Sequence, residues 1–135
     1  MIVLISIDKD YNNYSEFSET LQQIEKKSDF REFCCISNSL CDRYHTEYRS
    51  AIQKFKIEWD NLSCVSKSDI KTNKWGAPYN SRAPAIASEK ICKYATHIIE
   101  FGKGDYSISQ ALKNFNLTKI ETDRQSNHVS KRYNF

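Results

Sequence analysis

Apolar residues open the chain as a short run and then recur at helical spacing. Residues 1–7 form a nearly continuous, β-branched apolar run, which predicts a strand buried on both faces. After a polar turn, Phe17, Leu21 and Ile24 recur three and four positions apart, as on one face of a helix. The chain therefore begins with a strand followed by a helix that covers it.

A second strand followed by a helix is predicted next. Residues 33–36 predict a second short buried strand, and residues 37–39 are small polar residues suited to a loop and a helix cap. The next predicted helix carries one long apolar stripe, made of Leu40, Tyr44, Tyr48, Ala51, Ile52 and Phe55. Residues 62–65 are expected to form a third strand, and residues 66–74 a polar, lysine-bearing loop.

Residues 75–87 contain both prolines and one of the three glycines of the chain. This composition predicts a sharp turn of the backbone, followed by a helix from Arg82 to about Tyr94. The remaining pattern predicts a strand over residues 96–101, a glycine turn, a helix over residues 107–115 and a last strand over residues 117–121.

Strands that alternate with helices indicate an α/β protein. We expect a Rossmann-like three-layer sandwich, with a mostly parallel sheet of about five strands and helices on both faces. Residues 1–121 are expected to form this single domain. Residues 122–135 are polar and predict a C-terminal tail or an oligomerisation arm.

The composition of the chain limits the classes of partner that we expect. The chain has 135 residues, of which 39% are hydrophobic, enough to bury one modest core. Its 20 basic and 17 acidic residues give a net charge of +3, with lysines spread along the sequence, so the charge does not favour a nucleic-acid partner. No apolar run approaches the length that spans a bilayer, so no membrane partner is expected.

The number and spacing of the cysteines, and the first residues of the chain, predict the cellular compartment. Five cysteines are an odd number without zinc-site spacing, and the chain begins without a basic and apolar leader, so we expect a reducing cytoplasm, no metal and no cofactor. Abundant Asn, Lys, Ser, Tyr and Ile are typical of AT-rich genomes such as those of large bacteriophages. A phage protein would work in the host cytoplasm.

Topology predicts the position of a site. In an open parallel sheet, ligands bind beyond the carboxyl ends of the strands, where the strand order reverses and the loops diverge. The loops at that edge are expected to be residues 8–13, 37–42, 76–82 and 102–107.

Together these loops resemble the SLOG superfamily of small Rossmann-like, nucleotide-binding domains, which includes phosphoribohydrolases. In this family a Gly-Ser-Arg-like turn follows the first strand, and here Asp8-Lys9-Asp10-Tyr11 stands in that place. The family's second loop is glycine-rich and closes on an aspartate, which Asp42 matches. Its Arg-Asn pair before a helix corresponds to Arg82-Ala83 here.

The departures from the family predict binding without turnover. The loop before Asp42 lacks the glycines that let backbone amides surround a phosphate. In the last loop, Ser107 and Gln110 align with a threonine and a catalytic glutamate of the family. A glutamine cannot ionise, so phosphoribohydrolase catalysis is expected to be lost.

The predicted ligand-binding residues all lie in or beside these loops: Asp8, Lys9, Ser37, Asn38, Asp42, Trp75, Tyr79, Arg82 and Ser107. Several have a structural alternative. Arg82 could bind an anion or pair with Asp8, Asp10 or Glu100. Asp42 could bind a ribose hydroxyl or cap its helix, and Trp75 and Tyr79 could stack on a base or form an oligomer contact.

Three hypotheses on function follow. The first is a non-catalytic module that binds a nucleotide or nucleotide-derived small molecule in a cleft bounded by Lys9, Asp42, Trp75 and Arg82, and that sequesters a host signal. The second is an enzyme that acts on an N-glycosidic bond, for which the available carboxylates are Asp8, Asp42, Glu100 and Asp105. The third is an interaction scaffold, either a homo-oligomer subunit or an inhibitor of a host protein.

Overall fold

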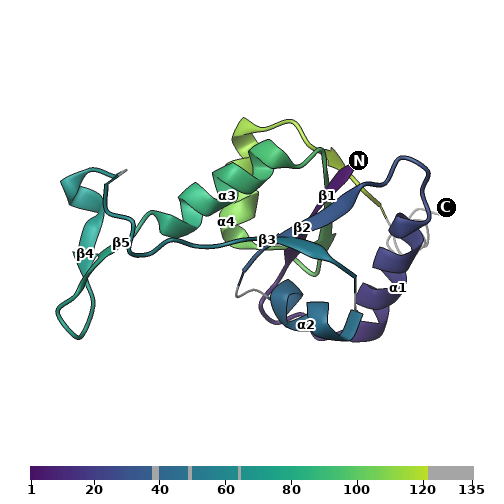
Figure 1. The fold of residues 1–135 in the computed structure, drawn as a ribbon, viewed down its shortest axis with the longest axis horizontal. Helices are drawn as coiled ribbons and strands as arrows, with labels where there is room; N and C mark the ends of the chain where they lie inside the picture. Colours follow the sequence, from purple (N-terminus) through teal and green to yellow (C-terminus); the bar gives the residue numbers. More distant parts are fainter. Residues whose placement is uncertain (38–39, 49, 64, 122–135) are drawn as a thin grey trace.

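A computed structural model describes residues 1–37, 40–48, 50–63 and 65–121 of the chain (Figure 1). Its main sheet has five strands in the order β3-β2-β1-β6-β7, namely Ile52–Phe55, Glu32–Ile36, Ile2–Ile7, His97–Phe101 and Thr118–Lys119. The four α-helices are α1 (Tyr14–Glu25), α2 (Leu40–Tyr48), α3 (Ala83–Tyr94) and α4 (Tyr106–Ala111). A separate two-stranded sheet pairs β4 (Ile70–Thr72) with β5 (Pro78–Asn80).

All four pairings in the main sheet are parallel. The chain starts at the central strand β1, moves outward through β2 and β3, and then returns to the other side of β1 to add β6 and β7. The strand order therefore reverses between β1 and β6. The predicted Rossmann-like α/β fold with a parallel sheet of five strands is confirmed.

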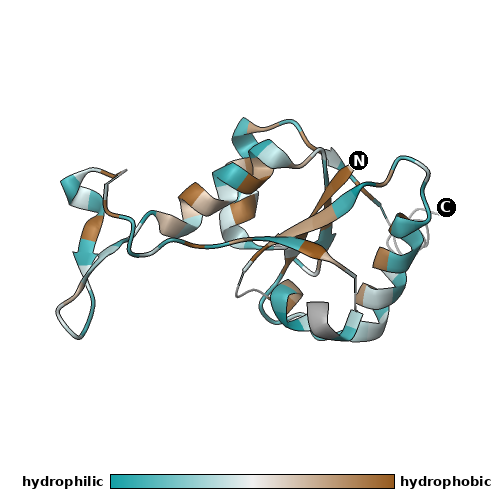
Figure 2. Cartoon of the chain, in the orientation of Figure 1, coloured by the Kyte–Doolittle hydropathy of each residue, from teal (hydrophilic) through white to brown (hydrophobic). Residues whose placement is uncertain are grey.

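The two faces of the sheet bury different side chains, because successive residues of a strand point to opposite faces. On β1, Val3, Ile5 and Ile7 pack with α1 and α2, whereas Leu4 packs with α3 and α4. Figure 1 shows these helix pairs on opposite sides of the sheet, and Figure 2 shows that the strands between them are hydrophobic. The two cores explain why the strands were apolar throughout rather than alternating.

Short polar side chains fix where two helices begin. The Oδ1 of Asn13 accepts a hydrogen bond from the amide of Glu16 at 3.1 Å, and the Oδ1 of Asp105 accepts one from the amide of Ile108 at 3.0 Å. Each bond satisfies an amide that has no partner within its helix. The helix α3 begins at Ala83, one residue after the predicted start at Arg82, which is its N-cap residue, and Pro84 lies in its first turn.

The predicted long helix after residue 40 is wrong in its second half. The helix α2 ends at Tyr48, and Ile52–Phe55 forms the edge strand β3, paired in parallel with β2. The apolar spacing was compatible with both structures, and the buried Ile52 completes the core under α1 and α2 instead of continuing a helix. Tertiary pairing with β2 decided between them.

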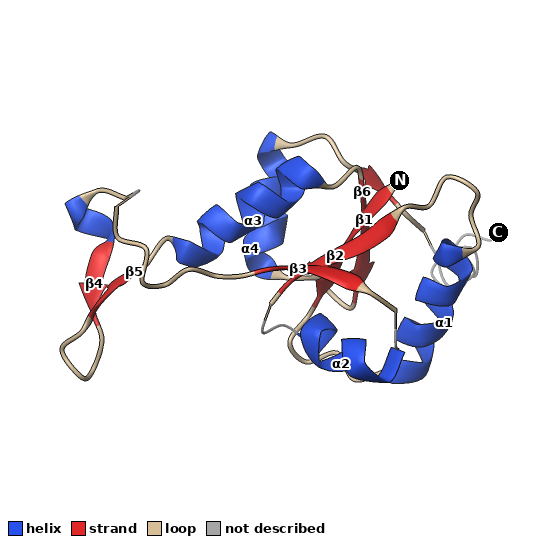
Figure 3. Ribbon diagram, viewed as in Figure 1, coloured by secondary structure: helices blue, strands red, loops and turns tan. Residues whose placement is uncertain are grey.

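The predicted strand over residues 62–65 is also wrong, because Leu62 and Ser63 lie in an irregular connection and Cys64 is outside the described residues. The segment expected as a loop, residues 66–74, instead contains a 3₁₀ turn (Lys67–Asp69) and β4. In Figure 3 the β4-β5 hairpin lies apart from the three layers, beyond the start of α3. Among the described residues no helix has the length and apolarity needed to cross a membrane.

Candidate functional site

A pocket of about 470 Å³ opens where the strand order reverses. Here the loop after β1 and the loop after β6 leave neighbouring strands and turn in opposite directions. We call this cavity the switch-point pocket. It is lined by Ile7, Asp8, Lys9, Leu40, Arg43, Gly104, Asp105, Tyr106 and Ser107. The predicted location of a site at the carboxyl edge of β1 and β6 thus coincides with a real cavity.

The loop after β6 depends on a glycine for its conformation and forms a hydrogen bond with the neighbouring strand β1. Gly104 has a φ of +73°, and a Cβ there would lie 2.9 Å from Oε2 of Glu100 and 3.0 Å from Oγ of Ser6. The Gly104 amide donates to the carbonyl of Phe101 at 3.2 Å, and the Asp105 amide donates to Oγ of the buried Ser6 at 2.7 Å. These two amides are therefore engaged within the protein and are not available to an anion in the pocket.

Two carboxylates line the pocket with part of their hydrogen-bonding capacity in use. Oδ1 of Asp8 accepts a hydrogen bond from the amide of Asp10 at 3.2 Å, and Oδ1 of Asp105 accepts the capping bond at the start of α4. The Oδ2 of each makes no hydrogen bond or ion pair within the described part of the chain. Both oxygens can accept a hydrogen bond from a hydroxyl group of a ligand.

Two cations and one aromatic ring complete the lining. Lys9 and Arg43 are exposed, and Lys9 forms no ion pair with any residue that the structure describes. Tyr106 is 77% exposed, so its ring is accessible to a planar group in the pocket. Carboxylates, cations and an aromatic ring in one cavity suit a polar ligand that carries an anionic group, hydroxyls and a ring.

Of the predicted ligand-binding residues, the structure brings Asp8, Lys9 and Ser107 together in this pocket. The sequence reasoning missed Arg43 and Tyr106. Arg43 comes from the first half of α2, and its proximity to β1 depends on how that helix packs. Tyr106 lies inside the predicted loop 102–107, so a large aromatic residue directly after a glycine turn was an available signal.

The loop after β2 contributes less than expected. The Ser37 amide donates to the carbonyl of Phe55 at 2.8 Å and continues the pairing of β2 with β3. Asp42 forms an ion pair with Lys54, with 2.5 Å between Oδ1 and Nζ. Neither residue lines the switch-point pocket. Asn38 lies outside the described residues.

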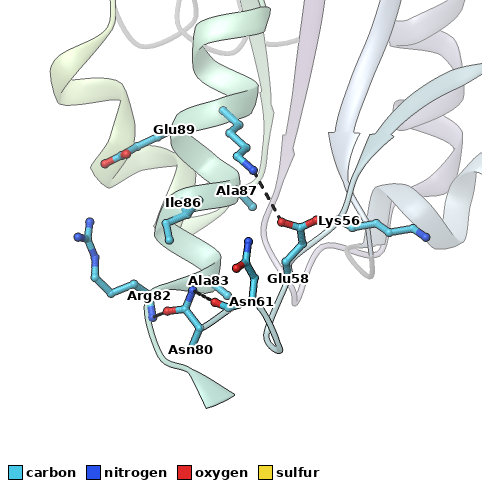
Figure 4. Close-up of a pocket in the computed structure, with 10 residues that line it drawn as sticks. Lys56, Glu58, Asn61, Asn80, Arg82, Ala83, Ile86, Ala87 and Glu89 are labelled. Carbon is cyan, nitrogen blue, oxygen red and sulfur yellow. Dashed lines mark hydrogen bonds and ion pairs between the residues drawn. The ribbon is translucent and has the colours of Figure 1, made fainter. Parts of the chain in front are cut away.

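Arg82 belongs to a different cavity, of about 320 Å³, between α3 and residues 56–61 (Figure 4). We call it the α3 pocket. Its lining comprises Lys56, Glu58, Asn61, Asn80, Arg82, Ala83, Ile86, Ala87, Glu89 and Lys90. Glu58 pairs with Lys90 at 3.7 Å in this pocket, and in Figure 4 Arg82 extends to the other side of α3.

The single predicted cleft bounded by Lys9, Asp42, Trp75 and Arg82 is not formed. Lys9 lines the switch-point pocket, Arg82 lines the α3 pocket, and Trp75 lies in the turn of the β4-β5 hairpin. Arg82 forms no ion pair with Asp8, Asp10 or Glu100, and Glu100 instead pairs with Lys119 at 3.2 Å. The reason is the hairpin, which carries the chain away from the sheet before α3 begins.

The described cysteines are unsuited to nucleophilic chemistry. Cys34, Cys35, Cys41 and Cys92 are all buried and free. Burial raises the pKa of Cys34 well above its ordinary value, and that of Cys92 to about 11. For Cys41, a hydrogen bond with Cys35 and then burial raise the pKa. The thiols of Cys34, Cys41 and Cys92 therefore stay protonated at neutral pH, and all four cysteines act as small core residues. The described residues contain no cluster of His, Cys, Asp and Glu that could hold a metal ion.

Comparisons of this chain with protein-family models, with curated proteins and with solved structures found no match.

Proposed function

We propose that this protein is a non-catalytic binding module for a nucleotide or a nucleotide-derived small molecule, as a degenerate relative of the SLOG superfamily. The observation that carries the proposal is the switch-point pocket, which combines Lys9, Arg43, Asp8, Asp105 and Tyr106 at the reversal of strand order. In open parallel sheets this position is where nucleotides bind. If the chain is phage-encoded, such binding without turnover would sequester a signal of the host cytoplasm.

Each part of a nucleotide has a matching group in the pocket. The side chains of Lys9 and Arg43 bind the phosphate, because both are exposed cations that line the pocket. The Oδ2 atoms of Asp8 and Asp105 accept hydrogen bonds from ribose hydroxyls. Tyr106 stacks on the base, with the large exposed area that such stacking requires.

Isothermal titration calorimetry with nucleosides, linear and cyclic nucleotides and ADP-ribose tests this proposal. A nucleotide is expected to bind more tightly than its nucleoside, because only the nucleotide engages Lys9 and Arg43. Lys9→Ala and Arg43→Ala should each reduce the affinity for the nucleotide by about tenfold, which corresponds to one charge-assisted hydrogen bond.

Lys103→Ala is the matched control for these variants, because Lys103 is exposed in the adjacent loop but does not line the pocket. Its affinity should equal that of the wild type. An absence of heat and of thermal stabilisation with every ligand contradicts the proposal, as does equal loss of affinity in the control and in Lys9→Ala.

One observation favours a second function, hydrolysis of an N-glycosidic bond. Asp8 and Asp105 line the same pocket, so one carboxylate can attack the sugar C1′ atom while the other carboxyl group donates a proton to the leaving base. Water then gives a proton back to that second carboxylate, attacks C1′ and releases the sugar together with the first carboxylate. The structure removes Asp42 from this role, because it is paired with Lys54. Release of free base from nucleosides or nucleoside monophosphates, abolished by Asp8→Asn, would support the enzyme over the binding module.

A further inference from the structure

The turn of the β4-β5 hairpin is held in one conformation by its own hydrogen bonds. Oδ1 of Asn73 accepts from the amides of Trp75 at 2.9 Å and Ala77 at 3.0 Å, and the Asn73 amide donates to the Ala77 carbonyl at 2.9 Å. Gly76 supplies the positive φ of +82° that this turn needs. Trp75 is therefore presented in a preorganised turn, with 79% of its surface exposed.

The base of the hairpin is anchored to the domain through Asn80, which is 1% exposed. Its amide donates to the Trp59 carbonyl at 2.6 Å, its Nδ2 donates to the Asn61 carbonyl at 3.1 Å, and its Oδ1 accepts from the Arg82 amide at 2.9 Å. A two-stranded hairpin by itself is marginally stable in water. These bonds join it to the preceding connection at residues 59 and 61 and to Arg82 at the start of α3, and in Figure 3 it extends from the domain as an arm.

Positive charge and aromatic rings gather on this arm. Residues 66–80 contain Lys67, Lys71 and Lys74 but one acid, Asp69, which gives a net charge of +2 against +3 for the whole chain. All three lysines are exposed, and no ion pair joins them to the described residues. The side chain of Asp69, the last residue of the local 3₁₀ turn, accepts a hydrogen bond from Oγ of Ser66 at 3.0 Å.

The rings lie close to these lysines. Nζ of Lys74 lies 4.5 Å from the centre of the Trp75 ring, which leaves the other face of that ring to a partner. Lys71 is paired across the hairpin with Tyr79, and the Tyr79 ring contacts that of Trp59 edge to face with 6.1 Å between centres. Lysines that bind phosphates, interleaved with rings that stack on bases, are the elements of a single-strand binding surface.

We propose that the β4-β5 arm binds single-stranded nucleic acid, with a base stacked on Trp75 and phosphates held by Lys71 and Lys74. The whole sequence did not favour this partner, because its lysines are distributed along the chain, but Lys71 and Lys74 lie on the hairpin and Lys67 lies in the 3₁₀ turn directly before it. The arm has few apolar residues beside Trp75, so it offers little area for insertion into a lipid surface. This site is separate from the switch-point pocket and does not depend on its ligand.

Tryptophan fluorescence tests the proposal directly. The chain has two tryptophans, so Trp59→Phe leaves Trp75 as the single reporter. An oligothymidylate of about 12 nucleotides should quench its emission, and labelled oligonucleotide should bind the otherwise wild-type Trp75→Ala variant about tenfold or more weakly. The double variant Lys71→Gln/Lys74→Gln should bind the oligonucleotide more weakly than the wild type. The magnitude of its slope of log affinity against log salt concentration should be smaller by about one to two.

The charge-matched control is Lys93→Gln/Lys103→Gln, which removes two exposed lysines that lie outside the hairpin. It should retain the wild-type salt slope, and an equal loss in this control would overturn the proposal. Binding a duplex of the same sequence, or polyglutamate, as tightly as the single strand would also overturn the proposal. So would displacement of the oligonucleotide by a mononucleotide. A blue shift of Trp75 emission on vesicles of equal phosphatidylcholine and phosphatidylglycerol, without quenching by the oligonucleotide, would overturn it as well.

Discussion

Lys54 at the edge of the sheet holds Asp42 of α2 in an ion pair, with 2.5 Å between Nζ and Oδ1. The hydrogen bond to Asp42 raises the pKa of Lys54, so the pair stabilises the charged form of the lysine. The pair links the helix α2 to the strand β3, two elements that are separated by a short connection. An aspartate that the family resemblance assigned to ligand binding therefore has a structural partner in this chain.

Replacing Asp42 is expected to affect stability rather than ligand affinity. Asp42→Asn should lower the free energy of unfolding only slightly, because Lys54 is more than one third exposed and solvent weakens the pair. Nucleotide affinity should stay within twofold of the wild type. Glu47→Gln on the same helix is the control for a change of charge, and calorimetry and urea unfolding measure both quantities. A tenfold loss of affinity in Asp42→Asn would return this residue to the binding site.

Gly104 is expected to tolerate no side chain. Gly104→Ala should lower the free energy of unfolding by about 2 to 3 kcal/mol, because its Cβ would meet Glu100 and Ser6 in addition to the cost of a positive φ. Gly76→Ala is the matched control, since Gly76 also has a positive φ but a Cβ there meets nothing within 4 Å. That variant should lose only about 1 kcal/mol. Equal losses in thermal or urea unfolding would show that the contacts with Glu100 and Ser6 do not matter.

Asn80 is expected to hold the hairpin arm to the domain. Asn80→Ala removes a buried amide and leaves the Arg82 amide and the Asn61 carbonyl without that partner, at a cost of about 2 kcal/mol. Hydrogen exchange should then accelerate in residues 70–80 more than in β1 and β6. The variant Asn73→Ala, at the other end of the hairpin, should affect the turn but not the base of the arm. Uniform acceleration over the whole chain would contradict a local anchoring role.

The buried thiols predict a loss of stability at alkaline pH. Burial raises the pKa of Cys92 from 9.0 to about 11, so between these values the unfolded chain has released a proton that the folded protein retains. The stabilisation is complete below about pH 9 and is lost as the pH rises toward 11. For this thiol the loss at about pH 10 is about 1 kcal/mol, and Cys34 and Cys41 act in the same direction. Thermal unfolding between about pH 7 and 10 measures this loss of stability.

Cys92→Ala is expected to reduce this pH dependence although it lowers the stability at neutral pH by removing core volume. The two effects can be separated, because the first changes the slope of the free energy of unfolding against pH and the second lowers that free energy equally at every pH. Identical slopes in the variant and the wild type would mean that other groups control the alkaline transition.

The amino-acid sequence by itself determined the layered α/β fold and the edge of the sheet where a site would lie. Apolar runs at residues 1–7 and 33–36, with amphipathic spacing between them, are local patterns that reflect burial on both faces of a parallel sheet. For the same reason Asp8, Lys9 and Ser107 could be placed at that edge. Asp8 and Lys9 directly follow β1, and Ser107 lies in the first turn of α4, so local patterns were enough to place them.

Tertiary structure decided what the local pattern left open. Ile52 and Phe55 fitted either a helix or a strand, and pairing with β2 selected the strand. The β4-β5 hairpin separated Trp75 and Arg82 from the switch-point pocket, and the packing of α2 brought Arg43 into it. These outcomes depend on contacts between segments far apart in the sequence, whose free energy no spacing of residues along one segment contains.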